Sequence, residues 1–292
     1  MNYRKRFVVE PGAGVRLGKI APGFKDKQDE SRDNAKREIQ KHVERLAKAQ
    51  YLLYADGSKS LLIVLQALDA GGKDGVVRHV FTSMNPQGTL AFSFKQPNNI
   101  EAAHDFLWRA HLHTPGKGQV VIFNRSYYED VLVVRVHKMV PKSVWSRRYD
   151  LINDFEKMLH DNGTRILKFY LHISPEEQLE RFAQRLDDPM RHWKISEGDY
   201  SERKLWPEYM EAYEEAIAKT TTKGAPWYVI PSDHKWFRDL AISEILADTL
   251  EDMDLKLPRA AVDIPEIRRK YHAAAAGQAR RGQKPPKASH RK

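Results

Sequence analysis

Residues 61–81 place one lysine and three glycines in a turn between a strand and a helix. The segment LLIVLQALDAGGKDGVVRHVF contains an apolar run, then Gly71, Gly72 and Gly75, and then a helical pattern. Such a turn directs backbone N–H groups and a helix start at one point, where the cation of Lys73 can bind phosphate oxygens. The alternative is a tight turn that merely contains lysine. The flanking strand and helix favour phosphate binding.

Two positions depart from the usual phosphate loop, G-x-x-x-x-G-K-[ST]. Ala67 stands where the first glycine falls, and Asp74 replaces the hydroxyl residue that touches Mg²⁺. Asp69 ends the strand, at the sheet edge where open α/β sheets bind ligands, so it is a candidate for metal binding or for steering the attacking phosphate oxygen. Asp74 can either cap the helix or pair with Lys73, and the sequence leaves both interpretations open.

A second polar cluster, IFNRSYYED, follows another predicted strand. Asn124 can coordinate a metal weakly, and the guanidinium of Arg125 suits bidentate phosphate contact. Glu129 and Asp130 could replace a missing carboxylate ligand. A polar surface turn is the alternative. Because the cluster should lie at the same sheet edge as the first loop, the functional interpretation is favoured.

A third cationic segment covers residues 181–206. Arg181 and Arg185 lie one helical turn apart, and Lys194 follows in a run of further cations. This pattern resembles the lid of a nucleotide kinase, which excludes water and neutralises phosphate charge. A solvated charged face explains the same residues equally well.

Strands alternate with helices around these clusters, which predicts an α/β fold of P-loop kinase type with a doubly wound, mainly parallel, five-stranded sheet. Helices should cover both faces, and a helical lid should span about 181–206. Residues 28–55 form an amphipathic helix, whose predicted inner face comprises Ile39, Val43, Leu46, Tyr51 and Leu52. The five strands are expected near 60–68, 89–94, 118–125, 165–173 and 225–231. Further helices are expected near 74–82, 98–113, 141–160 and 235–253, and another should begin at Ser174-Pro175.

Composition narrows the class of protein. The 292 residues include no cysteine, which excludes disulfides and thiolate metal sites, and no apolar run reaches the ~20 residues of a membrane helix. We therefore expect a cytoplasmic protein without a membrane partner. Residues 1–258 form one predicted domain. Residues 259–292 carry ten basic and two acidic residues, so they hold eight of the ten net positive charges. They are predicted to be a flexible basic tail, either a solubilising terminus or an anchor for a polyanion.

The motifs LDAGGKDG, NPQG, HDFLWRAH, FNRSYYEDVLVVRV, RLDDPMRHWK and APWYVIP, in this order, resemble the second family of polyphosphate kinases. The resemblance covers about residues 30–255 and leaves the basic tail outside. It implies a thymidylate-kinase-like core with a lid. It also implies transfer of the terminal phosphate of inorganic polyphosphate to a nucleotide with Mg²⁺, or alternatively Mn²⁺, and a homodimer or homotetramer.

The resemblance also assigns roles to residues. Asp69, Lys73 and Arg125 would be catalytic, and Asp69, Glu129 and Asp130 would bind metal. Phosphate or nucleotide would contact Gly71, Gly72, Asp74, Gly75, Asn124, Arg135, Arg181, Arg185 and Lys194. Asn124-Arg125-Ser126 followed by Glu129-Asp130 looks like the branch that accepts nucleoside mono- and diphosphates, which indicates AMP and ADP, with guanine nucleotides as an alternative base.

Two rival functions remain at this point. An ATP-dependent nucleoside-monophosphate kinase shares the expected fold and lid but usually has the complete phosphate-loop motif. A nucleic-acid-binding protein would act through the basic tail, and its phosphate loop would have no function. We expect no specific nucleic-acid partner.

Overall fold

The computed structural model describes residues 1–25 and 32–282, with side chains as far as residue 278. The chain divides into two compact units, Met1–Lys256 and Leu257–Lys292. We describe each unit by itself. The first four residues of the predicted helix 28–55 lie outside the described residues.

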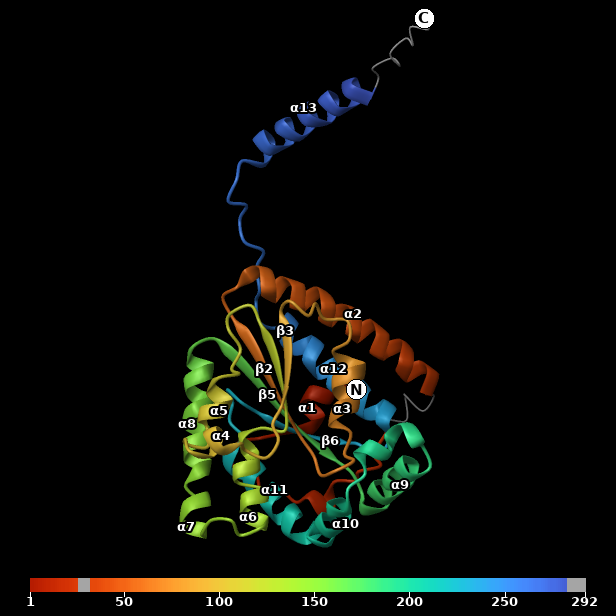
Figure 1. Cartoon of the computed structure of the whole chain (residues 1–292), viewed down its shortest axis with the longest axis vertical. Coiled ribbons are helices and arrows are strands. Elements are labelled where there is room, and N and C mark those ends of the chain that lie inside the picture. Colours follow the sequence, from red (N-terminus) through yellow and green to blue (C-terminus); the bar gives the residue numbers. More distant parts are fainter. Residues whose placement is uncertain (26–31, 283–292) are drawn as a thin grey trace, which may run out of the picture. The chain divides into compact units, whose positions relative to one another are not determined.

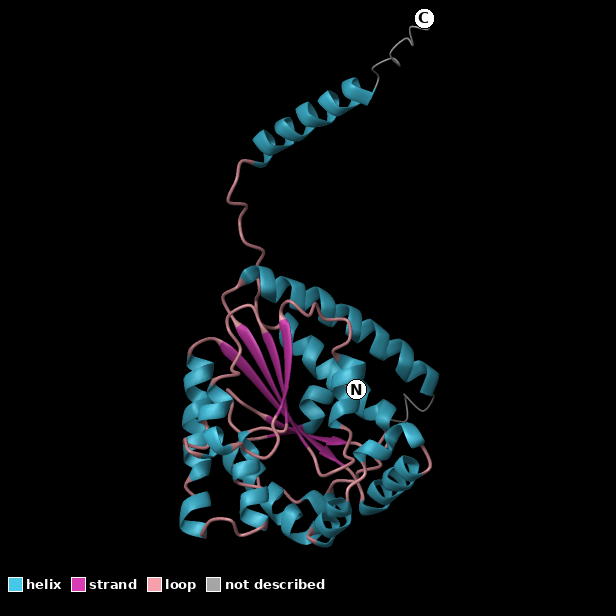
Figure 2. Cartoon of the chain, viewed as in Figure 1, coloured by secondary structure: helices cyan, strands magenta, loops and turns pink. Residues whose placement is uncertain are grey.

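The first unit is built on a mainly parallel sheet of six strands (Figures 1 and 2). In sheet order the strands are β1 (Val8–Val9), β6 (Trp227–Pro231), β5 (Thr164–His172), β2 (Ser60–Gln66), β4 (Val120–Asn124) and β3 (Thr89–Ser93). The five predicted parallel strands are confirmed, but the sheet has a sixth. β1 adds to β6 in the antiparallel direction. Two residues are too short to show a strand periodicity, so the sequence did not predict β1.

Helices cover both faces of this sheet (Figure 2). The α-helices of the first unit are α1 (Tyr3–Phe7), α2 (Arg32–Asp56), α3 (Lys73–Val80), α4 (Asn99–Ala102), α5 (Trp108–His111), α6 (Val133–Val136), α7 (Lys142–Trp145), α8 (Arg148–Asp161), α9 (Pro175–Leu186), α10 (Glu197–Lys204), α11 (Trp206–Thr220) and α12 (Lys235–Glu251). Short 3₁₀ helices are η1 (Leu17–Lys19), η3 (Tyr127–Asp130) and η4 (Pro189–Lys194).

The central strand β2 joins two hydrophobic cores. All seven of its residues are buried, as a strand between two helical layers requires. Its alternate side chains point to opposite faces: Ile63 belongs to the core with α1, α2, α3 and α12, and Leu62 to the core with α8 and α11. The predicted three-layer α/β architecture is therefore confirmed.

Three predicted helices differ in detail. In α2, Tyr51 is 64% exposed and Leu52 is only partly buried, whereas Leu53 is fully buried. Leu53 lies seven residues after Leu46 and so continues its face, while a spacing of five places Tyr51 well away from it. The helix predicted over 98–113 is divided into α4 and α5, because the Asp105 carboxylate accepts a hydrogen bond from Leu107 N (2.9 Å) in a turn between them.

The helix predicted over 141–160 is also divided, into α7 and α8. Both Trp145, near the end of α7, and Tyr149, near the start of α8, are buried. A turn at Ser146-Arg147 separates the two helices, although both residues keep right-handed helical dihedral angles.

The second unit contains the helix α13 (Ile264–Gly282), where the sequence predicted a flexible arm. Asp263 accepts a hydrogen bond from Glu266 N (3.1 Å), and the run of alanines at 273–276 favours helix by intrinsic propensity. The prediction relied on apolar periodicity, which an alanine- and arginine-rich helix does not need. Within residues 1–25 and 32–282, no helix is both long and apolar enough to cross a membrane.

Candidate active site

The phosphate-loop candidate lies between β2 and α3. Gly71 N donates to Leu68 O (3.0 Å), and Gly72 adopts a left-handed φ of +101° immediately before α3 begins. A Cβ at Gly72 would lie 2.0 Å from Nη1 of Arg238. Arg238 is almost fully buried and pairs with Asp239 (2.7 Å), so it cannot easily move away. Both the backbone conformation and the close approach therefore require glycine.

Lys73 is the buried cation of this loop. Its Nζ donates to Ala67 O (2.7 Å), and only 9% of the residue is exposed. Burial lowers the pKa of Lys73 to about 8, and the nearby Arg125 acts in the same direction, while Asp69 and Glu129 oppose it. These interactions show that the first two predicted clusters face one another.

Arg125, from the second cluster, contacts the strand end that carries the first cluster. Its backbone N donates to Leu65 O (3.1 Å) and its φ is +63°, so β4 turns sharply here. Its guanidinium donates to the Asp69 carboxylate (2.9 Å). Burial acts to lower the pKa of Arg125, but Glu129 and Asp69 outweigh burial and raise it.

Glu129 is the second carboxylate of the group. Burial raises the pKa of Glu129, while Arg125 and Lys73 counteract the rise. With its nitrogen turned toward Glu129, the Gln66 side-chain amide donates to Oε1 (3.0 Å). The site thus combines two cations and two carboxylates from two neighbouring strand ends.

Asp74 neither caps α3 nor forms an ion pair with Lys73, the two local roles that its position in the sequence left open. Its carboxylate accepts hydrogen bonds from Asn124 Nδ2 (2.8 Å) and from Lys194 Nζ (2.9 Å), and the N-cap position of α3 belongs to Gly72. Burial opposes ionisation, but the bonds from Lys194 and Asn124 outweigh it and keep the pKa of Asp74 below its usual value. Asp74 therefore links the loop to β4 and to the third predicted segment.

That third segment is helical, consisting of the end of α9, η4 and α10. Arg181 is buried and donates to Ala70 O (2.8 Å) and Ser232 O (2.5 Å), so it links α9 to the loop between β2 and α3 and to the residue that follows β6. Arg185 donates to Asp199 (3.2 Å) and to Lys194 O (3.3 Å). All three predicted cations of the segment are thus attached to the loop directly or through one another.

The structure does not bring two predicted residues to this group. Asp130 is the last residue of η3 and pairs with Arg148 of α8 (3.1 Å). Burial raises the pKa of Asp130 to about 6. Arg135 pairs with Glu215 (2.6 Å) and Glu211 (2.7 Å) of α11. Residues 1–25 and 32–282 contain no group of three His, Cys, Asp or Glu side chains that could hold a metal.

Sequence reasoning missed two residues of the site. Arg238 comes from α12 and lies against Gly72 and Gly75. Asp199 comes from α10 and interacts electrostatically with Asp69 and Arg125, while burial raises its pKa. Arg238 stands beside Asp239 in the helix predicted over 235–253, and this pair of opposite charges next to apolar residues was the available signal. Asp199 lies in a charged segment that gives no such signal.

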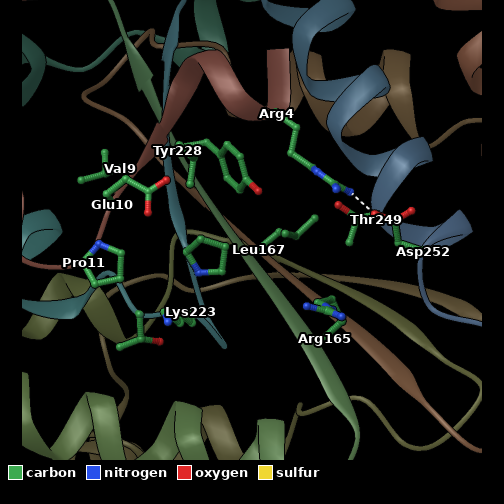
Figure 3. A pocket seen from close by; sticks show the side chains of 13 residues that line it. Arg4, Val9, Glu10, Pro11, Arg165, Leu167, Lys223, Tyr228, Thr249 and Asp252 are labelled. Atoms are coloured by element: carbon green, nitrogen blue, oxygen red, sulfur yellow. Dashed lines mark hydrogen bonds and ion pairs between the residues drawn. The ribbon is translucent and has the colours of Figure 1, made fainter. Parts of the chain in front are cut away.

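A separate pocket of about 260 Å³ lies beside β1 and the amino ends of β5 and β6, whereas the candidate site lies at the carboxyl ends of the parallel strands (Figure 3). Arg165, at the amino end of β5, lines it together with Arg4, Tyr228 and Asp252. None of the described residues that line this pocket belongs to the predicted site.

The mainly parallel α/β fold and the facing cations fit a phosphoryl-transfer enzyme. Residues 29–258 match the family "Polyphosphate kinase 2 (PPK2)". The AMP/ADP-polyphosphate phosphotransferase of Meiothermus ruber is 48% identical over 255 residues, which cover 87% of this chain and 96% of that protein. The ADP-polyphosphate phosphotransferase of Rhodopseudomonas palustris is 44% identical over 87% of this chain and 92% of its own length.

A solved structure agrees with this result. The crystal structure of polyphosphate kinase 2 from Arthrobacter aurescens superimposes with a TM-score of 0.90 at 40% identity, covering 94% of this chain and 97% of that one. The chain belongs to the polyphosphate kinase 2 family, whose members are polyphosphate-dependent phosphotransferases.

Proposed function

We propose that this enzyme transfers the terminal phosphate of inorganic polyphosphate to AMP and ADP, giving ADP and ATP, and that the reaction is reversible and uses Mg²⁺. The observation that carries the proposal is the convergence of Lys73, Arg125 and Lys194, from three separate segments, on one loop at the carboxyl edge of the sheet. The name of the Meiothermus ruber relative supports both acceptors. Asn124, in place of a carboxylate at the end of β4, is also consistent with that branch.

The chemistry asks the protein mainly for position and charge. An ionised oxygen of the acceptor phosphate attacks the terminal phosphorus of polyphosphate, and the bond to the bridging oxygen breaks, so the shortened polymer leaves with the electron pair. This transfer passes through a loose transition state, which is stabilised by aligned reactants and neighbouring cations. Lys73 and Arg125 supply fixed positive charge within a partly dehydrated loop. No protein nucleophile is required.

Two carboxylates of the site fit a magnesium ion. Mg²⁺ is usually held by one or two carboxylates together with substrate phosphates rather than by a complete protein cage. Asp69 and Glu129 would be these ligands, and Asp130, turned toward Arg148, would not. When bound, Mg²⁺ or Mn²⁺ supplies positive charge that the phosphate oxygens share. Asp69 also fixes the orientation of Arg125.

The test is ATP formation in the absence of added ATP. Purified protein, Mg²⁺, ADP and polyphosphate should produce ATP continuously, and AMP with polyphosphate should produce ADP first. A reaction without polyphosphate controls for ATP made from two ADP molecules. ATP-dependent phosphorylation of AMP, with no product from polyphosphate, would instead support a nucleoside-monophosphate kinase. Light scattering coupled to size-exclusion chromatography measures the molar mass of the protein and so tests whether it is a homodimer or a homotetramer.

A further inference from the structure

We propose that the C-terminal segment from residue 259 binds the polyphosphate polymer and holds it near the enzyme. This inference rests on the proposed function, because it concerns the same substrate. The segment lies beyond the family match, which ends at residue 258, and beyond the compact unit that ends at Lys256. The segment therefore lies outside both the family match and the compact unit that carries the candidate site.

The charge of the chain is concentrated in this segment. It holds a net charge of +8 on 34 residues, whereas the preceding 258 residues hold the other +2. Polyphosphate carries a negative charge on each internal phosphate, so the substrate is a long polyanion. Binding to such a polymer releases condensed counterions, which gives affinity without any specific contact. The charge distribution therefore suits the polymer better than it suits a nucleotide.

The described side chains of α13 are presented to solvent. Arg268 is exposed, and the side chains of Arg269 and Lys270 are 72% and 69% exposed. Glu266 pairs with Arg269 and Lys270, and it is the one acidic residue within α13. Arg268 makes no ion pair with any residue in the described part of the chain. Three consecutive helical residues point about 100° apart, so these cations are spread over about 200° of the helix circumference rather than along one stripe.

The same arrangement argues against two other partners. A membrane-surface helix needs a long apolar face opposite its cations. Here the exposed Ile264, Ile267 and Tyr271 form a short stripe that runs on into small alanines. Single-stranded nucleic acid is normally bound by several stacking aromatic side chains. Tyr271 is the one Phe, Trp or Tyr residue after position 258. Polyphosphate requires neither feature.

Attachment of such an arm to the core raises the effective concentration of the polymer at the loop. The benefit depends on chain length, since a short polyphosphate cannot occupy the arm and the active site together. The arm should therefore lower the KM for long polyphosphate without changing kcat. It should leave the KM for tripolyphosphate unchanged.

The experiment compares four forms: the full chain, a chain ending at residue 258, the triple variant Arg268→Gln, Arg269→Gln, Lys270→Gln, and a charge-preserving control. The control, Arg268→Lys, Arg269→Lys, Lys270→Arg, keeps every positive charge. Initial rates of ATP formation are measured with long-chain polyphosphate and with tripolyphosphate. Truncation should raise the KM for long polyphosphate at least about threefold. The triple Gln variant should reduce the slope of log affinity against log salt by about 2.

Two kinetic outcomes would overturn the proposal: an unchanged KM for long polyphosphate after truncation, or an equal rise in the KM for tripolyphosphate. A third would be that truncation abolishes binding of an RNA probe and leaves polyphosphate binding unaffected. Polyphosphate binding to the full chain is also measured directly by fluorescence anisotropy, which does not depend on turnover. If the full chain makes no ATP from polyphosphate, the proposed function fails. The anisotropy comparison of full and truncated chains then decides the role of the arm separately.

Discussion

Asp74 occupies the position where a phosphate-loop motif usually has a hydroxyl residue, and the structure shows which side chains its carboxylate contacts. Asp74 receives hydrogen bonds from Asn124 and Lys194, while Lys73 turns inward to Ala67 O. The lysine is thus kept in a buried, preformed position, and the carboxylate faces the segment that follows α9. One consequence of the buried position is a pKa close to the physiological range.

The first prediction concerns pH. Since burial lowers the pKa of Lys73 to about 8, kcat/KM should fall as the pH rises through about 8, where the free enzyme loses this charge. The variant Lys73→Arg stays charged over this range. It should have low activity but no alkaline limb near pH 8. Initial-rate profiles between pH 6 and about 10 measure this, and a limb near 8 that persists in Lys73→Arg would exclude Lys73 as its origin.

The same pKa affects stability with the opposite sign. Below about pH 8 the folded state buries a charged lysine, which is a penalty relative to the unfolded state. The unfolded state binds more protons between about 8 and the ordinary value of 10.5, so this contribution to the free energy of unfolding becomes more favourable as the pH rises through that window.

At the scale of elements, the segment from α9 to α10 is tied to the loop by a small number of polar contacts. Gln178 donates to Asp69 O (2.9 Å), Arg181 to Ala70 O (2.8 Å), and Lys194 to Asp74 (2.9 Å). The first two donors belong to α9 and are buried, whereas the Asp74 side chain is 67% exposed. We infer that the Lys194–Asp74 contact is the one that phosphate can most easily replace.

The second prediction follows from that contact. In Asp74→Asn, Lys194 loses its carboxylate partner, and one negative charge near the phosphates disappears. The KM for polyphosphate should fall a few-fold, and stability should change by less than about 1 kcal/mol because the pair is solvent-exposed. Lys194→Gln should raise the same KM. Steady-state kinetics with both variants measure this, and a large loss of kcat in Asp74→Asn would show instead that the carboxylate binds metal.

At the scale of the whole first unit, a buried polar network connects the site to the core. Lys168 of β5 donates to Glu156 of α8 (2.6 Å) and to Thr220 O at the end of α11 (2.7 Å). Tyr127 and Tyr128 of η3 each donate to Glu156 (2.8 Å). Lys168 and Glu156 are at most 1% exposed. The turn that carries Arg125 and Glu129 is therefore fixed by a charge pair beneath it.

The third prediction removes one partner of this pair. Lys168→Met leaves Glu156 buried without its cation, which should lower the free energy of unfolding by about 3 kcal/mol or more. The matched control is Lys157→Met on the same helix as Glu156, where the exposed pair with Asp161 should contribute less than about 1 kcal/mol. Urea unfolding of both variants tests this. Equal stabilities would mean that the tyrosine hydroxyls alone satisfy Glu156.

The sequence by itself determined the five parallel strands and the turn between β2 and α3, but it missed β1 and α13. The buried run of β2, the Ser174-Pro175 start of α9, the glycine turn and the facing of Lys73 and Arg125 all follow from neighbouring residues and from the rule that parallel strands end at one sheet edge. The strand, the helix start and the glycine turn are local, so a short stretch of chain specifies them, whereas the facing of Lys73 and Arg125 follows from the topology rule for parallel sheets.

Only the tertiary structure decided which polar side chains share the site. Asp130 follows Glu129 directly, yet it pairs with Arg148, and Arg238 reaches the loop from the last helix of the first unit. Lys194 meets Asp74 across 120 residues of chain. The direction of a charged side chain depends on which partners the fold brings near it, and spacing along the chain does not contain that information.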